Sequence, residues 1–174
     1  MADLLHVAKV IRDIADGFEE NVLKCMEENN ALVGDLVREQ LYCGVDGNGE
    51  YLSPSYDNDP YFKEEGPWKG RAQAYKLWKY EITPPMVGLR TSIHARPYDI
   101  PNLFIDGTFH DSIKAKLMKD GLDIYTSGFE DGPTIERKYG DNIFNLTDDS
   151  KDFFILYKLQ PHLEDFYKRC GYEL

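Results

Sequence analysis

Apolar residues recur every three or four positions over residues 4–28, and charged residues fill most of the positions between them. The apolar set consists of Leu4, Val7, Ile11, Ile14, Phe18, Val22 and Met26. Because this spacing places them on one side of a helix, the pattern predicts an amphipathic α-helix over residues 4–28. We expect Asn29 and Asn30 to end it, since asparagine disfavours helix interiors.

Residues 31–42 contain apolar positions that fit two different periods. These positions are Leu32, Val33, Leu36, Val37 and Leu41. They suit a helix by their spacing, and they also suit a strand with one irregularity. The asparagine pair precedes this segment and a glycine turn follows it, so we favour a strand.

The middle of the chain is rich in turn-forming residues. Over residues 43–66 we expect an exposed loop, because Asp46-Gly-Asn-Gly49 joins two dipeptides that are favoured in turns. Residues 67–80 are predicted to include a short basic helix. Residues 81–102 contain four prolines and are predicted to be an extended connection, with a possible strand at 86–93.

From residue 109 to residue 127 the pattern alternates with period two, which is typical of strands. One face carries Ile113, Ala115 and Leu117 before a turn at Lys119-Asp-Gly121, and Leu122 and Ile124 after it. An Asp-Gly pair between alternating segments is a strong hairpin signal. The segment is therefore predicted to be an antiparallel β-hairpin.

Two helices are predicted near the C-terminus. Gly132-Pro133 is expected to open a short helix that ends at Gly140, because proline suits the first helical turn and glycine the position after the last. Thr147 is the expected N-cap of the final helix, since two aspartates in its first turn favour the helix dipole. Pro161 must kink or split that helix, because proline has no amide hydrogen to donate.

The length and the hydrophobic fraction favour one folded domain over residues 1–174. The chain has 174 residues, of which 42% are hydrophobic and 13% aromatic, and this is enough for a core. The elements together predict an α+β fold, in which a long N-terminal helix packs on a small antiparallel sheet. A C-terminal helix kinked near Pro161 and an extended loop region at about 43–102 complete the prediction.

The formal net charge of −11 argues against sequence-specific nucleic-acid binding and against docking on anionic membranes, since both need a basic surface. A negative wall can still repel phosphates and let DNA slide past it. No apolar run approaches the roughly 18 residues of a membrane span. The three cysteines are widely spaced without a C-x-x-C pair, which predicts free thiols.

No pattern for catalysis, a cofactor or a metal is found. The stretch from Cys43 to Glu50 lacks the ligand spacing of a calcium loop, and the four histidines are scattered. Asp111, His110 and Ser112 can be drawn as a catalytic triad, but neighbouring positions of a strand face opposite sides, so Asp111 would not share a face with His110 and Ser112. We therefore predict no catalytic, cofactor-binding or metal-ligating residue. A small hydrolase using Asp106, His110 or Glu136 is an alternative.

The predicted basic helix mixes cationic and aromatic residues, which is typical of contact surfaces. The candidate subunit-contact residues are Trp68, Lys69, Arg71, Tyr75, Lys76, Trp78 and Lys79. In an acidic chain we expect this segment to contact an acidic face of a neighbouring copy. A self-contained packed helix is one alternative, and base stacking on nucleic acid is the other.

Three short motifs resemble a known family. Gln40, Leu41, Gly44, Asp46 and Gly49 fit a Q-L-x-x-G-x-D-x-x-G turn, and Pro54 with Tyr56 fits a P-x-Y step. Leu103, Gly107, Phe109 and Ser112 fit an L-x-x-T-G-x-F/L-x-x-S strand entry, with Asp106 in place of the threonine, and Tyr139-Gly140 follows later. This order of motifs resembles the tail-completion or virion-morphogenesis proteins of tailed bacteriophages. A segment at about 57–102 is longer and more basic than that family suggests.

The resemblance implies a structural role in the virion. It implies an α+β protein without catalytic residues, which forms a homo-oligomeric ring, hexameric or dodecameric, at the junction of head and tail. Such a ring would join the connector to the tail, line the DNA channel and contact other neck, portal-adaptor or tail proteins. An assembly chaperone or soluble protein-binding module, absent from the finished particle, is the alternative.

Overall fold

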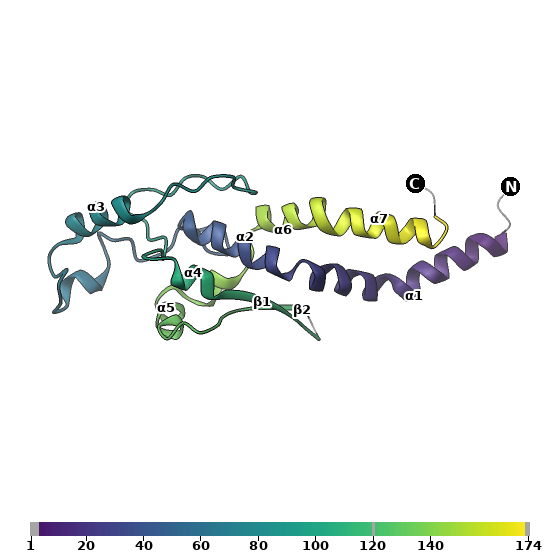
Figure 1. Ribbon diagram of the computed structural model, residues 1–174, viewed down its shortest axis with the longest axis horizontal. Coiled ribbons are helices and arrows are strands. Elements are labelled where there is room, and N and C mark those ends of the chain that lie inside the picture. The colour runs from purple at the N-terminus through teal and green to yellow at the C-terminus, as the bar shows by residue number, and fades with distance from the viewer. Residues whose placement is uncertain (1–3, 120, 173–174) are drawn as a thin grey trace.

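The computed structural model describes residues 4–119 and 121–172, and in it a two-helix arm extends from a body of shorter elements (Figure 1). The arm pairs α1 (Leu4–Glu28) with the C-terminal helical run of α6 (Asp148–Phe154), η3 (Ile155–Leu159) and α7 (Gln160–Arg169). The two partners run antiparallel, so the start of α1 and the end of α7 both lie at the far end of the arm. The body comprises residues 30–147.

The N-terminal helix α1 has the predicted bounds, but the segment after it is a second helix, α2 (Asn30–Tyr42), and the predicted strand is wrong. The asparagine pair breaks the helix at one residue only, because the Asn29 side chain donates to the Cys25 carbonyl at 2.9 Å. Apolar residues of α2 at helical spacing are buried: Val33, Leu36, Val37 and Leu41. They pack between the β-hairpin and α6.

The predicted hairpin is confirmed, with β1 (Ile113–Met118) antiparallel to β2 (Gly121–Thr126). Ala115 pairs with Ile124 and Leu117 with Leu122, so the apolar positions share the face that packs on the helices. Asp120 of the predicted turn lies outside the described residues. The strand begins at Ile113 and not at residue 109, because a short helix, α4 (Thr108–Ser112), precedes it.

The loop region 43–102 is more closely packed than predicted. Leu52, Tyr56 and Phe62 are buried, and the region contains η1 (Pro60–Lys63) and α3 (Ala72–Ile82). The strand predicted at 86–93 is absent, since none of the residues 83–103, all of them described, belongs to a strand. The three buried side chains, which were expected to lie in an exposed loop, instead form part of the core, whereas residues 48–51 and 63–66 are exposed as expected.

The C-terminal predictions hold. Helix α5 (Gly132–Tyr139) ends at Gly140, where φ is +85°, and η2 (Asp141–Phe144) follows. Thr147 caps α6 by accepting from the Ser150 amide at 3.2 Å. Ahead of Pro161 the α-helix widens into the π-helical turn η3, since the proline cannot donate to the preceding turn. The α+β fold class is therefore shown.

The core consists of two buried clusters. The larger one lies inside the body, and its buried members are Val37, Leu41, Leu52, Phe109, Ile113 and Ile143. The smaller one lies where the arm joins the body, and its buried members are Cys25, Val33, Leu36 and Phe154. No described helix combines the length and the apolar character that a membrane crossing requires.

Candidate functional site

The predicted contact segment forms an aromatic cluster around α3 at the end of the body away from the arm (Figure 1). The Tyr75 ring lies 5.1 Å from Trp68 and 5.3 Å from Trp78, measured between centroids. Tyr56 and Phe62, which come from the preceding loop, each lie 5.2 Å from Tyr75. The three aromatic contact candidates, Trp68, Tyr75 and Trp78, are all partly buried. They therefore pack mainly within the chain.

The positive charges of this segment are only partly exposed, since Lys69 and Arg71 face solvent whereas Lys76 and Lys79 are buried. Lys76 is buried and its ammonium contacts Asp57 at 2.7 and 2.8 Å. Lys69 pairs with Glu65, and the Arg71 guanidinium lies over the Trp68 ring at 5.7 Å. A subunit-contact role stays a prediction for the exposed part of the segment, but the charge of Lys76 is already paired with Asp57 inside the chain.

Lys79 is the most unusual of these residues. It is 2% exposed, and among the described residues no hydrogen bond or ion pair reaches its ammonium group. Burial, together with the positive charge of Arg96, lowers the pKa of Lys79 to about 7. A lysine buried without a carboxylate is rare, because the desolvated charge is left uncompensated.

The turn of the first family motif has a structural basis. The Asp46 carboxylate accepts from the backbone amides of Asn48 and Glu50 at 2.8 and 3.1 Å, which closes the turn. Gly44 has a φ of +73°, and a Cβ there would lie 2.6 Å from Ile100. Gly49 has a φ of +78° and is open to solvent. These residues shape the fold and point to no ligand.

The later motif residues are also structural. Gly107 has a φ of +93° and opens α4, which places Phe109 in the larger core cluster. Tyr139 packs against the same cluster, and Gly140 ends α5 with its positive φ. Gln40, which belongs to the first motif, accepts from the Thr147 amide at 3.1 Å and donates to the Asn145 carbonyl. The motifs therefore mark the contacts that hold the body together.

The catalytic triad of Asp111, His110 and Ser112 considered from the sequence does not form. His110 is buried, and its Nε2 lies 2.9 Å from the Asn102 carbonyl oxygen. Burial lowers the pKa of His110 to about 4, so the ring is neutral at pH 7. Ser112 donates to the Phe109 carbonyl at 2.6 Å, and Asp106 is tied to Thr108. His110, Ser112 and Asp106 therefore each have a backbone or side-chain partner other than one another.

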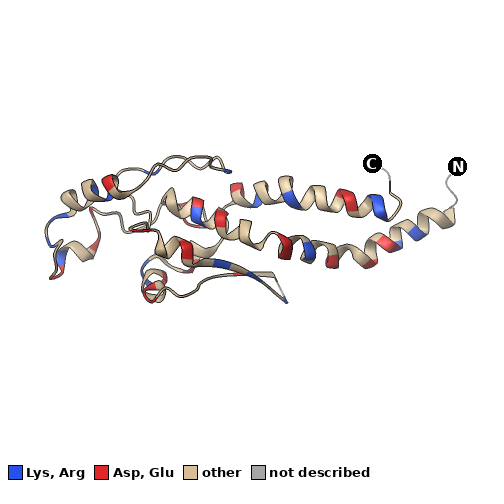
Figure 2. Ribbon diagram, viewed as in Figure 1, with Lys and Arg blue, Asp and Glu red and all other residues tan. Residues whose placement is uncertain are grey.

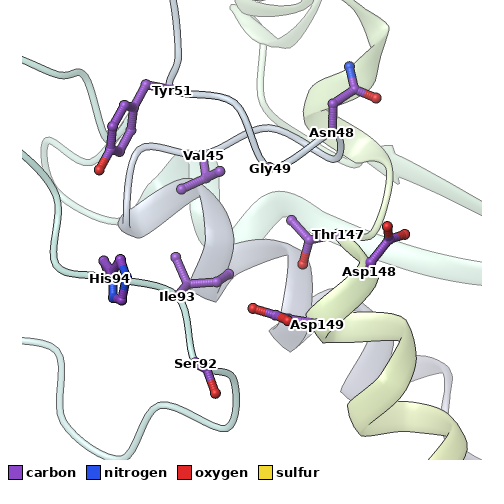
Figure 3. A pocket seen from close by; sticks show the side chains of 10 residues that line it. All are labelled: Val45, Asn48, Gly49, Tyr51, Ser92, Ile93, His94, Thr147, Asp148 and Asp149. Carbon is purple, nitrogen blue, oxygen red and sulfur yellow. The ribbon is translucent and has the colours of Figure 1, made fainter.

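A surface hollow of about 340 Å³ lies beside the motif turn, and Figure 3 shows three chain segments around it. The segments contribute Asn48 and Gly49 from the turn, Ile93 and His94 from the extended connection, and Asp149 from α6. His94 and Asp149 are exposed to solvent. Within the described residues no group of three His, Cys, Asp or Glu side chains could hold a metal ion.

The arm carries two apolar surfaces that no part of the described chain covers. The first, which we call the α1 stripe, consists of Leu4, Val7, Ile11 and Phe18, with exposed fractions of 84%, 41%, 62% and 42%. The second, the η3 patch, consists of Ile155, Leu156 and Tyr157, which are about half exposed. Acidic positions outnumber basic ones along α1 between these apolar residues (Figure 2).

The α1 stripe is the row of residues that the sequence pattern assigns to a buried face, yet the C-terminal helix packs on a different row. Val10 is buried, and a Cβ at Gly17 would lie 3.0 Å from the Phe166 ring, so Gly17 lets the two helices approach closely. Periodicity identified the apolar row correctly but could not tell which row the intramolecular partner covers.

No protein-family model, no curated protein and no solved structure matches this chain. The likeness to phage proteins therefore stands on the short motifs alone. The structure itself shows a packed body that contains those motif residues, and an arm whose exposed apolar residues no described residue covers.

Proposed function

We propose that this protein is a non-enzymatic structural protein of a tailed bacteriophage, which forms a ring at the head–tail junction. There it would join the connector to the tail and line the DNA channel. The observation that carries the proposal is the uncovered α1 stripe on a helix that extends away from the core. Contiguous exposed apolar residues of this kind mark protein–protein contact surfaces.

Two different uncovered surfaces on one chain support a ring in particular. A head-to-tail contact uses two distinct faces, and it closes into a ring when the rotation between copies permits. The α1 stripe and the η3 patch are such a pair, because both are apolar and they lie on opposite partners of the arm. We infer that the stripe of one copy packs on the patch of the next.

The net charge of −11 fits a protein that lines a DNA channel. DNA must pass through the head–tail junction without sticking, and a negative wall repels its phosphates. The burial of Lys76 against Asp57 supports this argument, since it removes one positive charge of the basic segment from the surface.

Paired substitutions test the ring. The double variant Ile11→Gln/Phe18→Gln removes the centre of the stripe, and Leu156→Gln/Tyr157→Gln removes the patch. Lys9→Gln/Asp16→Gln is the matched control, because it introduces the same residue at exposed positions of the same helix and leaves the net charge unchanged. We expect light scattering to give six or twelve times the 20.1 kDa chain mass for the control and the monomer mass for both variants.

Mixing the two variants gives the sharper result. Each variant keeps one intact face, so an equimolar mixture should form a discrete dimer and nothing larger. A wild-type protein that stays monomeric at high concentration would rule out the ring. Variants that oligomerise like the control would show that other surfaces make the contact.

The location in the particle needs a separate measurement. Mass spectrometry of purified phage particles should find this protein at a copy number equal to that of the portal protein or half of it. Its absence from particles would favour the second candidate function, an assembly chaperone or protein-binding module.

One observation favours that second candidate. An apolar groove of about 540 Å³ lies between α3 and the extended connection, lined by Tyr42, Tyr80, Met86, Leu89 and Tyr98 among others. A monomer that holds a peptide there would fit a chaperone. The light-scattering experiment separates the two functions, since the chaperone needs no ring.

A further inference from the structure

A cavity of about 290 Å³ lies between η1, α3 and α5, on the far side of the body from the arm. Its walls are mostly aromatic and aliphatic, and they include Tyr56, Phe62, Tyr75 and Tyr139. Lys79 also lines the cavity. The volume is at the lower end of the range for ligand sites, so an occupant would be small.

The charges around the cavity are unbalanced. Asp59 lines it, but the Asp59 carboxylate is already paired with Lys138 and accepts from the Tyr61 amide at 3.0 Å. Lys79 has no such partner among the described residues. Arg96 and His110 are the other ionisable groups that act on Lys79, and neither supplies a negative charge. The cavity therefore contains one cation without an anion.

We propose that this cavity binds a small carboxylate carried on an aromatic or aliphatic stem. The carboxylate lies against the Lys79 ammonium and supplies the missing counter-charge, and the stem packs between the tyrosine rings. A buried charge-assisted hydrogen bond of this kind is among the stronger polar contacts in proteins. The site is independent of the proposed ring, because none of the lining residues belongs to the α1 stripe or the η3 patch.

Binding should take up a proton. Burial lowers the pKa of the empty site's Lys79 to about 7, so about half of the molecules lack that proton at pH 7, and a bound anion restores it. Four other ionisable groups near Lys79 or the cavity do not titrate there. His110 is already neutral, and burial raises the pKa of Tyr75 to about 12 and the pKa values of Tyr56 and Tyr139 further above their ordinary value.

Isothermal titration calorimetry with benzoate tests the site. Measurements at pH 7 to 8.5 in phosphate and in Tris give the proton count, because the two buffers differ in ionisation enthalpy. We expect millimolar or tighter binding, with an uptake of about half a proton at pH 7 and nearly one at pH 8.5. Benzyl alcohol, which has the same ring without the charge, should bind without proton uptake.

Three variants separate Lys79 from the rest of the fold. Lys79→Met keeps an unbranched side chain of nearly the same length and removes the amine, and it should weaken benzoate binding at least tenfold. Lys63→Met, at an exposed position of η1, is the matched control and should bind like the wild type. Ile105→Trp should block the cavity while it keeps Lys79, since Ile105 lines the cavity and is 56% exposed.

A carboxylate of this kind can come from a free acid or from an aspartate or glutamate of a second copy. If saturating benzoate and Lys79→Met both weaken self-association, the natural carboxylate belongs to another copy. If self-association is unchanged while benzoate still binds, it belongs to a free acid. The absence of benzoate binding, or equal binding by Lys79→Met, would overturn the proposal.

Discussion

The body and the arm use their apolar residues in opposite ways. Helix α2 has 13 residues and buries seven of them, whereas the 25 residues of α1 include two buried ones, Val10 and Cys25. The body is thus folded by its own contacts, and its family-motif glycines and Gln40 fix the turns around the core. The arm keeps a row of apolar residues uncovered, which is expected of a segment whose stability comes from association.

The largest expected effect is on the free energy of unfolding, when one leucine of the body and one isoleucine of the arm are each replaced by alanine. Leu41→Ala should lower the free energy of unfolding by about 2–5 kcal/mol, because Leu41 is fully buried and the surroundings cannot close the cavity. Ile11→Ala should change it by less than about 0.5 kcal/mol in the monomer, since Ile11 is exposed. Urea denaturation of the two variants measures both values.

Both substitutions place alanine in a helix, so differences in helix propensity are small and the contrast reports packing. Equal losses for the two variants would mean that the arm is as tightly packed as the body. That result would remove the structural argument for association through the α1 stripe.

The next effect concerns pH and the body alone. The pKa of Lys79 falls from its ordinary 10.5 to about 7 in the folded chain, so between these values the unfolded chain binds a proton that the folded chain does not. Stability must therefore rise with pH in this window, by about 2 kcal/mol between pH 7 and pH 9. Below pH 7 the cost of the buried charge is constant.

The comparison with Lys79→Met isolates this contribution. The variant should lack the rise, whereas Lys63→Met should keep it, and chemical denaturation at pH 7, 8 and 9 measures the difference. The measurements stop at pH 9 because above it the buried tyrosines make the free energy of unfolding fall with pH. Their raised pKa values make the folded chain keep protons that the unfolded chain loses near pH 10. Parallel pH profiles for wild type and Lys79→Met would mean that Lys79 is solvated.

Two glutamines, one in the body and one in the arm, should give a smaller difference in the free energy of unfolding. Gln40→Leu should cost about 1–2 kcal/mol, because it leaves the Thr147 amide and the Asn145 carbonyl without their partner, and the buried leucine recovers part of the loss. Gln160→Leu on α7 should cost less than about 0.5 kcal/mol, since Gln160 is exposed and bonds only to Glu164 on the same helix. A similar cost at both positions would show that the Gln40 contacts are not specific to the body.

Local signals in the sequence were sufficient for most elements. The spacing over residues 4–28 gave α1, the Asp-Gly turn gave the hairpin, and Gly140 and Thr147 marked helix ends. Each of these depends on residues a few positions apart. The strand predicted at 31–42 failed because a single-residue break at Asn29 looks like a stop, and the side chain that repairs it is visible only in three dimensions.

The candidate sites could not be predicted in this way. The Lys79 cavity is assembled from residues near positions 56–62, 75–79, 101–105 and 135–139, which no local pattern connects. The burial of Lys76 depends on Asp57, nineteen positions away along the chain. Whether the α1 stripe is covered depends on which side of α1 Phe166 packs against. The position of Gly17 in the sequence does not reveal that Phe166 is the residue that packs on it.

The smallest expected free energies are those of local opening of the arm, which amide hydrogen exchange measures. In the monomer the amides of residues 4–18 should exchange much faster than those of α2, because few buried contacts oppose local opening of the first half of α1. Assembly should then raise protection along residues 4–18 and leave α2 unchanged, since the stripe becomes covered. The Lys9→Gln/Asp16→Gln control should gain the same protection at the same concentration. If residues 4–18 of the monomer were as protected from exchange as α2, the arm would already be stable without association. The body and the arm would then differ in exposed apolar surface and not in local stability.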